Sequence, residues 1–370
     1  ASMIHNEMRK HGIKLVLGYT VEGFKEKDNG VEVLLKDNPS LQADMVVLAI
    51  GVTPDTVLAK EAGLELGIKE SIVVNDRMET SVPDIYAAGD AVQVKHYVTG
   101  NDALISLAGP ANKQGRIIAD NICGGDSRYL GSQGSSVIKV FDMTAATTGI
   151  NETNAKKSGL EVDTVILSPM SHAGYYPGGK VMTMKVVFEK ESYRLLGAQI
   201  IGYEGVDKRI DVLATAIHAG LNATQLKDLD LAYAPPYSSA KDPVNMAGFM
   251  IDNIAKGTLK QWHLEDMDKI SKDKDVVLLD VRTVGEFSMG HIDGFKNIPV
   301  DELRERISEI EKGKPVYLIC QSGLRSYIAS RILEGNGYET YNFSGGFRFY
   351  DAVVNDRALI ERAYACGMDY

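Results

Sequence analysis

A cysteine set directly between an apolar strand and a helix constrains the fold of this chain more than any other feature. Residues 315–319 have the composition of a buried strand, and Cys320 opens a short loop that ends at Arg325. The residues that follow predict a helix over 326–334, closed by Gly335. A buried strand that leads straight into a helix is typical of α/β layers. The sequence therefore predicts a compact α/β module around this loop.

The same loop has the chemistry of a nucleophile. A thiol between the carboxyl end of a strand and a helix N-terminus faces free backbone amides, and Arg325 adds positive charge. Both favour the thiolate over the thiol. We therefore expect Cys320 to attack sulfane sulfur, hold it as a persulfide and pass it to an acceptor thiol. The residues expected to cradle that sulfur are Gln321, Ser322, Gly323 and Leu324.

Two other interpretations compete for this loop. A cysteine at the end of a buried strand can be purely structural. A cysteine-dependent phosphatase also closes its loop with an arginine and binds phosphate on backbone amides. Only four residues separate Cys320 from Arg325, however, whereas such phosphatases have a longer loop and a wider cup. The narrow loop suits thiosulfate or polysulfide better than phosphate.

Composition narrows the class of protein further. The chain has 370 residues, enough for about two to four domains. The chain has 40 Lys and Arg and 50 Asp and Glu, which leaves a formal charge of −10. This charge argues against binding of nucleic acid by general electrostatic attraction. The longest apolar run, residues 45–50, is too short for a membrane helix, so we expect no membrane contact. Three cysteines are too few for a disulfide framework or a four-ligand zinc site, which indicates a reducing, cytoplasmic compartment and no metal.

The first residues predict pieces of a parallel fold. Residues 4–11 read as a helix, 14–17 and 31–35 as short strands, and 44–50 as an apolar strand of the kind covered on both faces, ending at Gly51. A buried parallel strand needs neighbours that these pieces do not supply. We therefore expect that sequence upstream of residue 1 is missing.

Two segments resemble signatures of the flavin-dependent pyridine nucleotide-disulfide oxidoreductases. They are residues 49–54, Ala-Ile-Gly-Val-Thr-Pro, and residues 80–90, Thr-Ser-Val-Pro-Asp-Ile-Tyr-Ala-Ala-Gly-Asp. In the second, a short apolar strand over residues 85–88 runs into Gly89, which lets a ligand approach the backbone, and Asp90 offers a carboxylate. The resemblance implies that Asp90 binds the ribityl hydroxyls of FAD. The alternative is a turn aspartate that caps the next helix.

A helix is predicted to start near Gly109, with Pro110 in its first turn. The resemblance places this N-terminus beneath the pyrimidine edge of the flavin, with Ala111 and Asn112 as binding positions. An ordinary packing helix remains an equal alternative for any one of these residues, because a helix N-terminus alone is not diagnostic. Cys123, near the end of this helix, is expected to be a small buried hydrophobe.

The next segment resembles the interface domain through which these flavoenzymes dimerise. Strands are predicted over residues 137–141, 164–167, 181–188 and 195–201, and an amphipathic helix over residues 206–219. Within it, the tyrosine-rich stretches 171–178 and 233–243 resemble the coenzyme A disulfide reductase branch, including its NADH-dependent polysulfide or persulfide reductases.

At the position where related enzymes have a His-Glu pair, that branch has tyrosines. A phenol stays neutral at pH 7 and can donate a hydrogen bond or a proton to a thiolate. The resemblance implies that Tyr237, and less strongly Tyr233 and Tyr176, assist the thiol of the partner subunit. The alternative is that they pack a dimer interface.

The C-terminal segment resembles the rhodanese (sulfurtransferase) domain. The resemblance rests on the strand over residues 276–282, the turn over 290–294, the Cys320 loop and residues 344–347, Ser-Gly-Gly-Phe. Asp280 and Arg282 are expected to brace the loop, His291 to stabilise a turn, and Cys366 to be exposed without a role.

These features together predict an α/β chain that holds a remnant of doubly wound FAD and NAD(P) domains, an α+β dimerisation domain and a rhodanese-like α/β domain. The expected segments are residues 1–75 (NAD(P)-binding part), 76–130 (FAD-binding part), 131–258 (dimerisation) and 262–370 (rhodanese). The chain contains no Gly-x-Gly-x-x-Gly fingerprint, so its FAD site would be incomplete.

The resemblance implies a homodimeric, cytoplasmic enzyme that uses NAD(P)H, FAD and coenzyme A in its full-length form. Its sulfur substrates would be coenzyme A disulfide or persulfide, polysulfide or thiosulfate. The alternative is a truncated dimeric scaffold without reductase turnover, whose rhodanese module serves sulfide sensing or protein binding.

Overall fold

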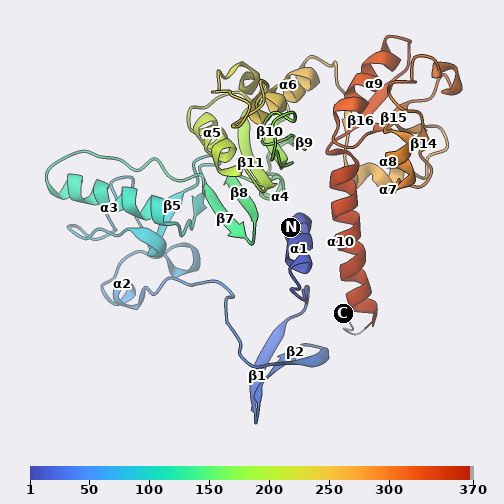
Figure 1. Ribbon diagram of the computed structural model, residues 1–370. Coiled ribbons are helices and arrows are strands. Elements are labelled where there is room, and N and C mark those ends of the chain that lie inside the picture. Colours follow the sequence, from blue (N-terminus) through green and yellow to red (C-terminus); the bar gives the residue numbers. More distant parts are fainter. Residues whose placement is uncertain (367–370) are drawn as a thin grey trace. The chain divides into compact units, whose positions relative to one another are not determined.

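The structure is a computed structural model that describes residues 1–366, with side chains described through residue 360. It divides into two compact units (Figure 1). One contains residues 1–94, 102–130 and 352 onward, and the other contains residues 95–101 and 131–351. The predicted mixed α/β class is confirmed. No helix among the described residues is long and apolar enough to cross a membrane.

The larger unit contains an antiparallel five-stranded sheet in the order β7-β8-β11-β10-β9. Its strands are β7 (Ser136–Val140), β8 (Met143–Gly149), β9 (Val162–Leu167), β10 (Thr183–Glu189) and β11 (Leu195–Gly202). The helices around it are α4 (Glu152–Lys157), α5 (Val206–His218), η3 (Ala223–Asp228) and α6 (Pro243–Ala255). Helix α5 packs on β8 and β11 and buries its apolar face in one continuous core. The sequence analysis did not predict β8 or α6.

A second sheet in this unit is entirely parallel, in the order β12-β16-β15-β13-β14. Its strands are β12 (Gln261–Trp262), β13 (Val277–Asp280), β14 (Lys296–Asn297), β15 (Val316–Ile319) and β16 (Thr340–Phe343). The helices are η4 (Leu264–Asp266), α7 (Met267–Ile270), α8 (Val284–Ser288), η5 (Ile307–Glu309) and α9 (Leu324–Glu334). Helix α10 (Gly346–Cys366) begins in this unit, and its residues from 352 onward belong to the smaller one. Two separate apolar clusters include side chains of this sheet, as a parallel sheet covered on both faces requires.

The smaller unit is built from short elements. It holds an antiparallel meander of β1 (Val21–Lys27), β2 (Gly30–Leu35) and β3 (Asn38–Ala43), and a small sheet of β4 (Ile72–Val73), β5 (Val92–Lys95) and β6 (Asp102–Ala103). Its helices are α1 (Ser2–Lys10), α2 (Val57–Glu61), η1 (Ile68–Glu70), η2 (Gly89–Ala91) and α3 (Ala108–Ile122). Among the residues that the structure describes, its buried apolar cluster is made of Met78, Val92 and Val94, with partly buried neighbours around it.

Four expectations in this unit are wrong. Residues 44–50 are not a strand, and Met45 and Ile50 are 76% and 85% exposed, because no described strand supplies the hydrogen-bonded neighbours that a buried strand needs. Residues 14–17 are also irregular, and residues 85–88 make only an isolated bridge between Tyr86 and Glu79. Cys123 is exposed, not buried. The side chain of Cys366 lies outside those described.

Candidate functional site

The thiol of Cys320 lies in a small ring of hydrogen-bond donors. Cys320 follows β15 directly and is fully buried. Its Sγ accepts hydrogen bonds from the backbone N–H of Gly323, at 3.1 Å, and from the hydroxyl of Ser326, at 3.2 Å. Gly323 has a φ of 100°, a left-handed conformation that favours glycine, and it is the N-cap of α9. The tight turn at Gly323 thus directs its N–H at the sulfur and stabilises negative charge there.

The start of α10 holds the loop from behind. The N–H of Phe347 donates to the carbonyl of Cys320 at 2.8 Å, and the N–H of Arg348 donates to the carbonyl of Gln321 at 3.2 Å. Gly346 has a φ of 69°, and a Cβ atom there would lie 2.7 Å from the backbone of Gln321. The Gly-Gly-Phe segment therefore serves a close backbone approach to the loop.

Arg325 forms a two-pronged ion pair with Glu286. Both guanidinium-to-carboxylate distances are 2.7 Å. The hydrogen bond from Arg325 is the main reason that the pKa of Glu286 falls to about 2, and Glu286 in turn raises the pKa of Arg325. The carboxylate also accepts the N–H and hydroxyl of Thr283. Arg325 thus links the loop to α8, and its charge is shared with Glu286. Glu286 was not among the predicted site residues.

Asp280 and Arg282 form a buried brace beside the loop. Nε and Nη2 of Arg282 donate to Asp280 at 2.9 and 2.7 Å, and its guanidinium lies 3.8 Å from the ring centre of Phe347. Phe347 is the residue that holds the carbonyl of Cys320, so the brace acts on the loop through α10. The ring centres of His291 and Phe287 are 4.0 Å apart, and the rings are stacked. Nδ1 of His291 lies 3.1 Å from the carbonyl oxygen of Phe287.

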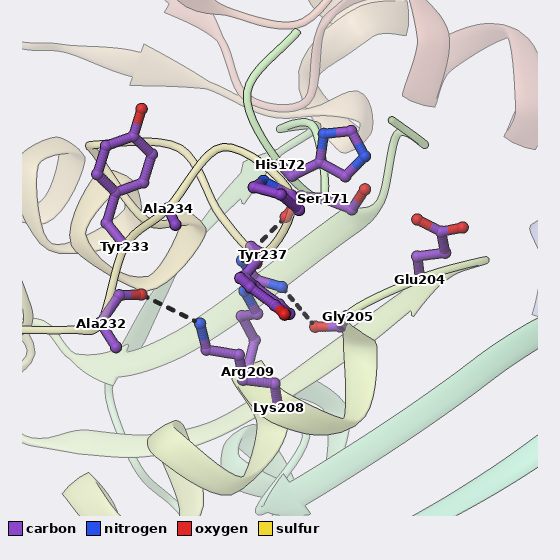
Figure 2. Close-up of a pocket in the computed structure, with 11 residues that line it drawn as sticks. Ser171, His172, Glu204, Gly205, Lys208, Arg209, Ala232, Tyr233, Ala234 and Tyr237 are labelled. Carbon is purple, nitrogen blue, oxygen red and sulfur yellow. Dashed lines mark hydrogen bonds between the residues drawn. The ribbon is translucent and has the colours of Figure 1, made fainter. Parts of the chain in front are cut away.

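Two of the three predicted tyrosines line a separate cavity of about 520 Å³ in the same unit (Figure 2). Tyr233 and Tyr237 both line it. Tyr237 is 72% exposed, and the hydroxyl of Tyr233 lies 2.9 Å from that of Tyr175, an interaction that raises the pKa of Tyr233. Tyr176 does not line the cavity and packs edge-on against His172, which does.

Arg209 positions the loop that contains Tyr237, and the sequence analysis did not single it out. Its buried guanidinium donates to Asp242 at 3.0 Å and to the carbonyls of Ser171 and Tyr237 at 3.0 and 3.3 Å. Figure 2 shows it beneath Tyr237, within reach of Ser171 and Gly205. A basic residue on the apolar face of the predicted helix 206–219 was the available signal, since a charge is buried only with partners.

The expected flavin-binding residues lie together in the smaller unit. Gly89 has a φ of 84°, its N–H donates to Gln114 of α3 at 2.7 Å, and a Cβ on it would lie 3.8 Å from Ala111. Asp90 is exposed and lines a cavity of about 420 Å³. Pro110 and Asn112 lie in the first turns of α3, whose N-cap makes no side-chain hydrogen bond.

This arrangement fits one part of FAD. An exposed carboxylate beside an uncapped helix N-terminus suits the ribityl hydroxyls and the ring edge. The glycine fingerprint that would receive the pyrophosphate does not occur in the chain.

The chain is similar to known proteins along most of its length. Residues 1–115 match the model of the pyridine nucleotide-disulphide oxidoreductase family, residues 135–243 its dimerisation domain, and residues 263–352 the rhodanese-like domain. The chain belongs to the pyridine nucleotide-disulphide oxidoreductase family and carries a rhodanese-like domain.

Relatives within that family point to one branch. The chain is 36% identical over 242 residues to the NAD(P)H sulfur oxidoreductase (CoA-dependent) of Pyrococcus abyssi, covering 65% of this chain and 54% of that protein. It is 35% identical over 247 residues to a coenzyme A disulfide reductase of Staphylococcus aureus, covering 66% and 55%. The chain spans about half the length of these curated relatives.

Two solved structures are also similar to this chain. The reduced CoADR-RHD of Bacillus anthracis has a TM-score of 0.93 and 46% identity, covering 96% of this chain and 64% of that one. A NAD-dependent persulfide reductase from A. fulgidus has a TM-score of 0.87 and 40% identity, covering 95% and 64%.

Proposed function

We propose that this chain is part of an NAD(P)H-dependent reductase of coenzyme A disulfide, coenzyme A persulfide or polysulfide, joined to a sulfurtransferase. The observation that carries the proposal is the Cys320 thiol, buried at a helix N-terminus and bonded by Gly323 and Ser326. Names of the similar proteins, a CoA-dependent sulfur oxidoreductase and a persulfide reductase, support the same sulfur chemistry.

The sulfurtransferase step follows from the loop geometry. The Cys320 thiolate attacks the outer sulfur of thiosulfate, a new S–S bond forms, and sulfite leaves with the electron pair of the broken bond. The outer sulfur of the resulting persulfide carries negative charge, which the dipole of α9 would stabilise, and the amide of Gly323 bonds the Sγ to which that sulfur is attached. An acceptor thiolate then removes that sulfur and returns Cys320 to the thiolate.

The reductase half needs groups that this chain would hold only in part. FAD, when bound, passes electrons from NAD(P)H to a disulfide. Asp90 would accept hydrogen bonds from the ribityl hydroxyls, and the N-terminus of α3, with Pro110, Ala111 and Asn112, would stabilise negative charge at the ring edge. Tyr237, assisted by Tyr233, would supply a proton to a thiolate of the partner subunit.

The dimerisation domain supports a homodimer, and the scarcity of cysteines favours the cytoplasm as the compartment. In this assembly the tyrosine cavity of one protomer would serve the thiol of the other. The reductase reaction and the sulfurtransferase reaction would then take place in the same dimer.

The test of the proposal is sulfur transfer by the chain and by Cys320→Ala. We expect the chain to transfer sulfur from thiosulfate to cyanide and the variant to show no transfer above background. Mass spectrometry after polysulfide treatment should find added sulfur on Cys320. Equal rates in both proteins, or no added sulfur on Cys320 in folded material, would contradict the proposal and favour a sensing or protein-binding module.

A further inference from the structure

The hydroxyl of Ser326 has two acceptors within reach and one proton to donate. Its Oγ lies 3.2 Å from Sγ of Cys320 and 3.1 Å from the carbonyl oxygen of Gly323. A serine hydroxyl carries a single hydrogen, so it can donate fully to only one of these acceptors. Ser326 is fully buried, so the two acceptors compete for this proton inside the protein. The sulfur receives it only if the Gly323 carbonyl is satisfied by other donors.

Two N–H groups supply those donors. The backbone N–H of Tyr327 donates to the Gly323 carbonyl at 3.1 Å, in the first turn of α9. Nδ2 of Asn342 donates to the same oxygen at 3.2 Å. A carbonyl oxygen has two lone pairs, so these two N–H groups fill both of its acceptor positions. The Ser326 hydroxyl is then left for the sulfur.

Asn342 reaches the loop from a neighbouring strand. It lies in β16, in register with Leu318 of β15, the strand that delivers Cys320. The backbone N–H of Asn342 donates to the carbonyl of Lys260 at 2.9 Å, and the residue is only 3% exposed. The parallel sheet therefore fixes both the sulfur and the amide that bonds the Gly323 carbonyl.

The orientation of the Asn342 amide follows from the same contact. With the amide reversed, Oδ1 would face the carbonyl oxygen of Gly323, and two acceptors would be in contact. In the orientation observed, Oδ1 has no hydrogen-bond partner among the described residues. A buried acceptor without a donor is unfavourable. The side chain thus leaves one bond unmade while its Nδ2 bonds the loop, which indicates that the donor is the group that matters at this position.

We propose that Asn342 is a positioning residue for the Cys320 reaction, because it occupies the Gly323 carbonyl and so leaves the Ser326 hydroxyl to Sγ. The inference rests on the proposed sulfurtransferase function and adds a residue to that site. Asn342 acts on the sulfur through Gly323 and Ser326. Without its amide, the Ser326 proton would be shared between the carbonyl and Sγ, and negative charge on the sulfur would be stabilised less.

The experiment is a double-mutant cycle of Asn342→Leu and Ser326→Ala, with kcat/KM for thiosulfate as the readout. Leucine is close to asparagine in size but has no donor. Asn342→Leu should lower kcat/KM about three- to fivefold, because the sulfur keeps only a share of one hydrogen bond. In the Ser326→Ala background the same change should lower it less than about twofold, since no hydroxyl is left to redirect. Equal fold-changes in the two backgrounds would overturn the inference.

The matched control is Gln261→Leu, a change of a second amide in the same sheet. Gln261 pairs with Asn342 in the register of β12 and β16, and its Oε1 also has no hydrogen-bond partner within the described part of the chain. Its Nε2 donates to Asp163 and to the carbonyl of Thr164, both in β9 and outside the loop. Gln261→Leu should therefore leave kcat/KM unchanged in both backgrounds. A loss as large as that of Asn342→Leu would assign the effect to general damage of the sheet and count against the inference.

Neutron diffraction of wild-type crystals in heavy water tests the same arrangement without a variant. It locates the deuterium of the Ser326 hydroxyl, which X-ray diffraction at ordinary resolution does not show. We expect the deuterium to lie between Oγ and Sγ of Cys320. A deuterium directed at the carbonyl of Gly323 would overturn the inference, even if Asn342→Leu fails to fold.

The diffraction measurement also separates this inference from the proposed function. If Cys320 gains no sulfur while the deuterium points at Sγ, the sulfurtransferase proposal fails and the arrangement of donors stands. If Cys320 gains sulfur but Asn342→Leu has the same effect with and without the Ser326 hydroxyl, only the role of Asn342 fails.

Discussion

At the scale of single residues, two donors decide what the Cys320 thiol can do. Sγ is fully buried, so the donors that contact it come from the protein and not from solvent. The amide of Gly323 is part of the backbone and only proline would remove it, whereas alanine removes the hydroxyl of Ser326. Ser326 is therefore the residue through which the ring can be tested.

We expect Ser326→Ala to lower kcat/KM for thiosulfate about tenfold, because a donor aimed at developing negative charge is lost. The fold should be retained, since the change removes one atom from α9. Ser330→Ala is the matched control, because the Ser330 hydroxyl donates to the carbonyl of Tyr327 within the same helix and makes no hydrogen bond with Sγ among the described residues. Equal activity of the two variants would show that the Ser326 hydroxyl plays no part in the reaction.

The Glu286–Arg325 pair gives a dependence of stability on pH. The pKa of Glu286 is lowered from 4.5 to about 2, so the pair contributes fully above about pH 4.5 and is lost as the pH falls toward 2. Glu286→Gln should lower the free energy of unfolding by about 1–2 kcal/mol at pH 7. Urea unfolding at pH 7 and pH 3 should show that the difference between wild type and variant shrinks at the lower pH. A constant difference would contradict the assignment.

At the scale of elements, the site depends on where helices begin. Gly323, the N-cap residue of α9, presents its amide to Sγ, and α10 presents the amides of Phe347 and Arg348 to the carbonyls of Cys320 and Gln321. Helix α5 brings Arg209 to the carbonyl of Tyr237. The contacts of α10 and α5 join residues that are distant in sequence, whereas the contact of Gly323 is local.

Gly346→Ala should damage the junction of α10 with the loop. The added Cβ would lie 2.7 Å from the backbone of Gln321, and the φ of 69° is strained for alanine. We expect a loss of about 1–3 kcal/mol in the free energy of unfolding, together with reduced sulfur transfer. Gly285→Ala in α8 is the control, because a Cβ there meets nothing within 4 Å. If Gly346→Ala unfolds like the control, the close packing described for α10 is wrong.

Asp242→Ala should be among the most destabilising changes in the larger unit. It would leave the buried Arg209 guanidinium without its carboxylate and remove the cap of α6, where Asp242 accepts the N–H of Val244 at 3.0 Å. We expect a loss of about 3–5 kcal/mol, measured by thermal or urea unfolding. Asp252→Ala, a change of an α6 carboxylate with surface lysine partners, should cost less than about 1 kcal/mol. Similar losses in the two variants would argue against a buried ion pair.

At the scale of the whole molecule, the two units differ in how much apolar surface they bury. The larger unit has extensive cores, whereas Met45, Val47, Leu48 and Ile50 of the smaller unit are all more than half exposed. Contiguous exposed apolar surface favours association. Self-association of the chain could therefore have two sources, the dimerisation domain or this exposed segment.

Equilibrium sedimentation should give a species of twice the 40.3 kDa chain mass. The double variant Val47→Ser, Leu48→Ser should leave this mass unchanged, because the proposed interface lies in the dimerisation domain. A monomeric chain would contradict the homodimer. A variant that becomes monomeric would assign the association to the exposed segment.

Features that depend on neighbouring residues could be predicted from the sequence. The strand before Cys320, the helix after it and the amphipathic helix over 206–219 were all predicted, because apolar periodicity and glycine stops are local signals. Signature segments identified the family for the same reason. Cys320 could be singled out because its chemistry follows from its place between a strand and a helix.

Contacts between residues that are distant in sequence became known from the folded structure. It pairs Arg325 with Glu286, sets Gly346 against Gln321 and, within the described part of the chain, leaves Oδ1 of Asn342 without a hydrogen-bond partner. It also leaves residues 44–50 exposed although their composition reads as a buried strand. Burial and pairing are properties of the neighbours that folding brings together, and a local pattern of residue types does not contain them.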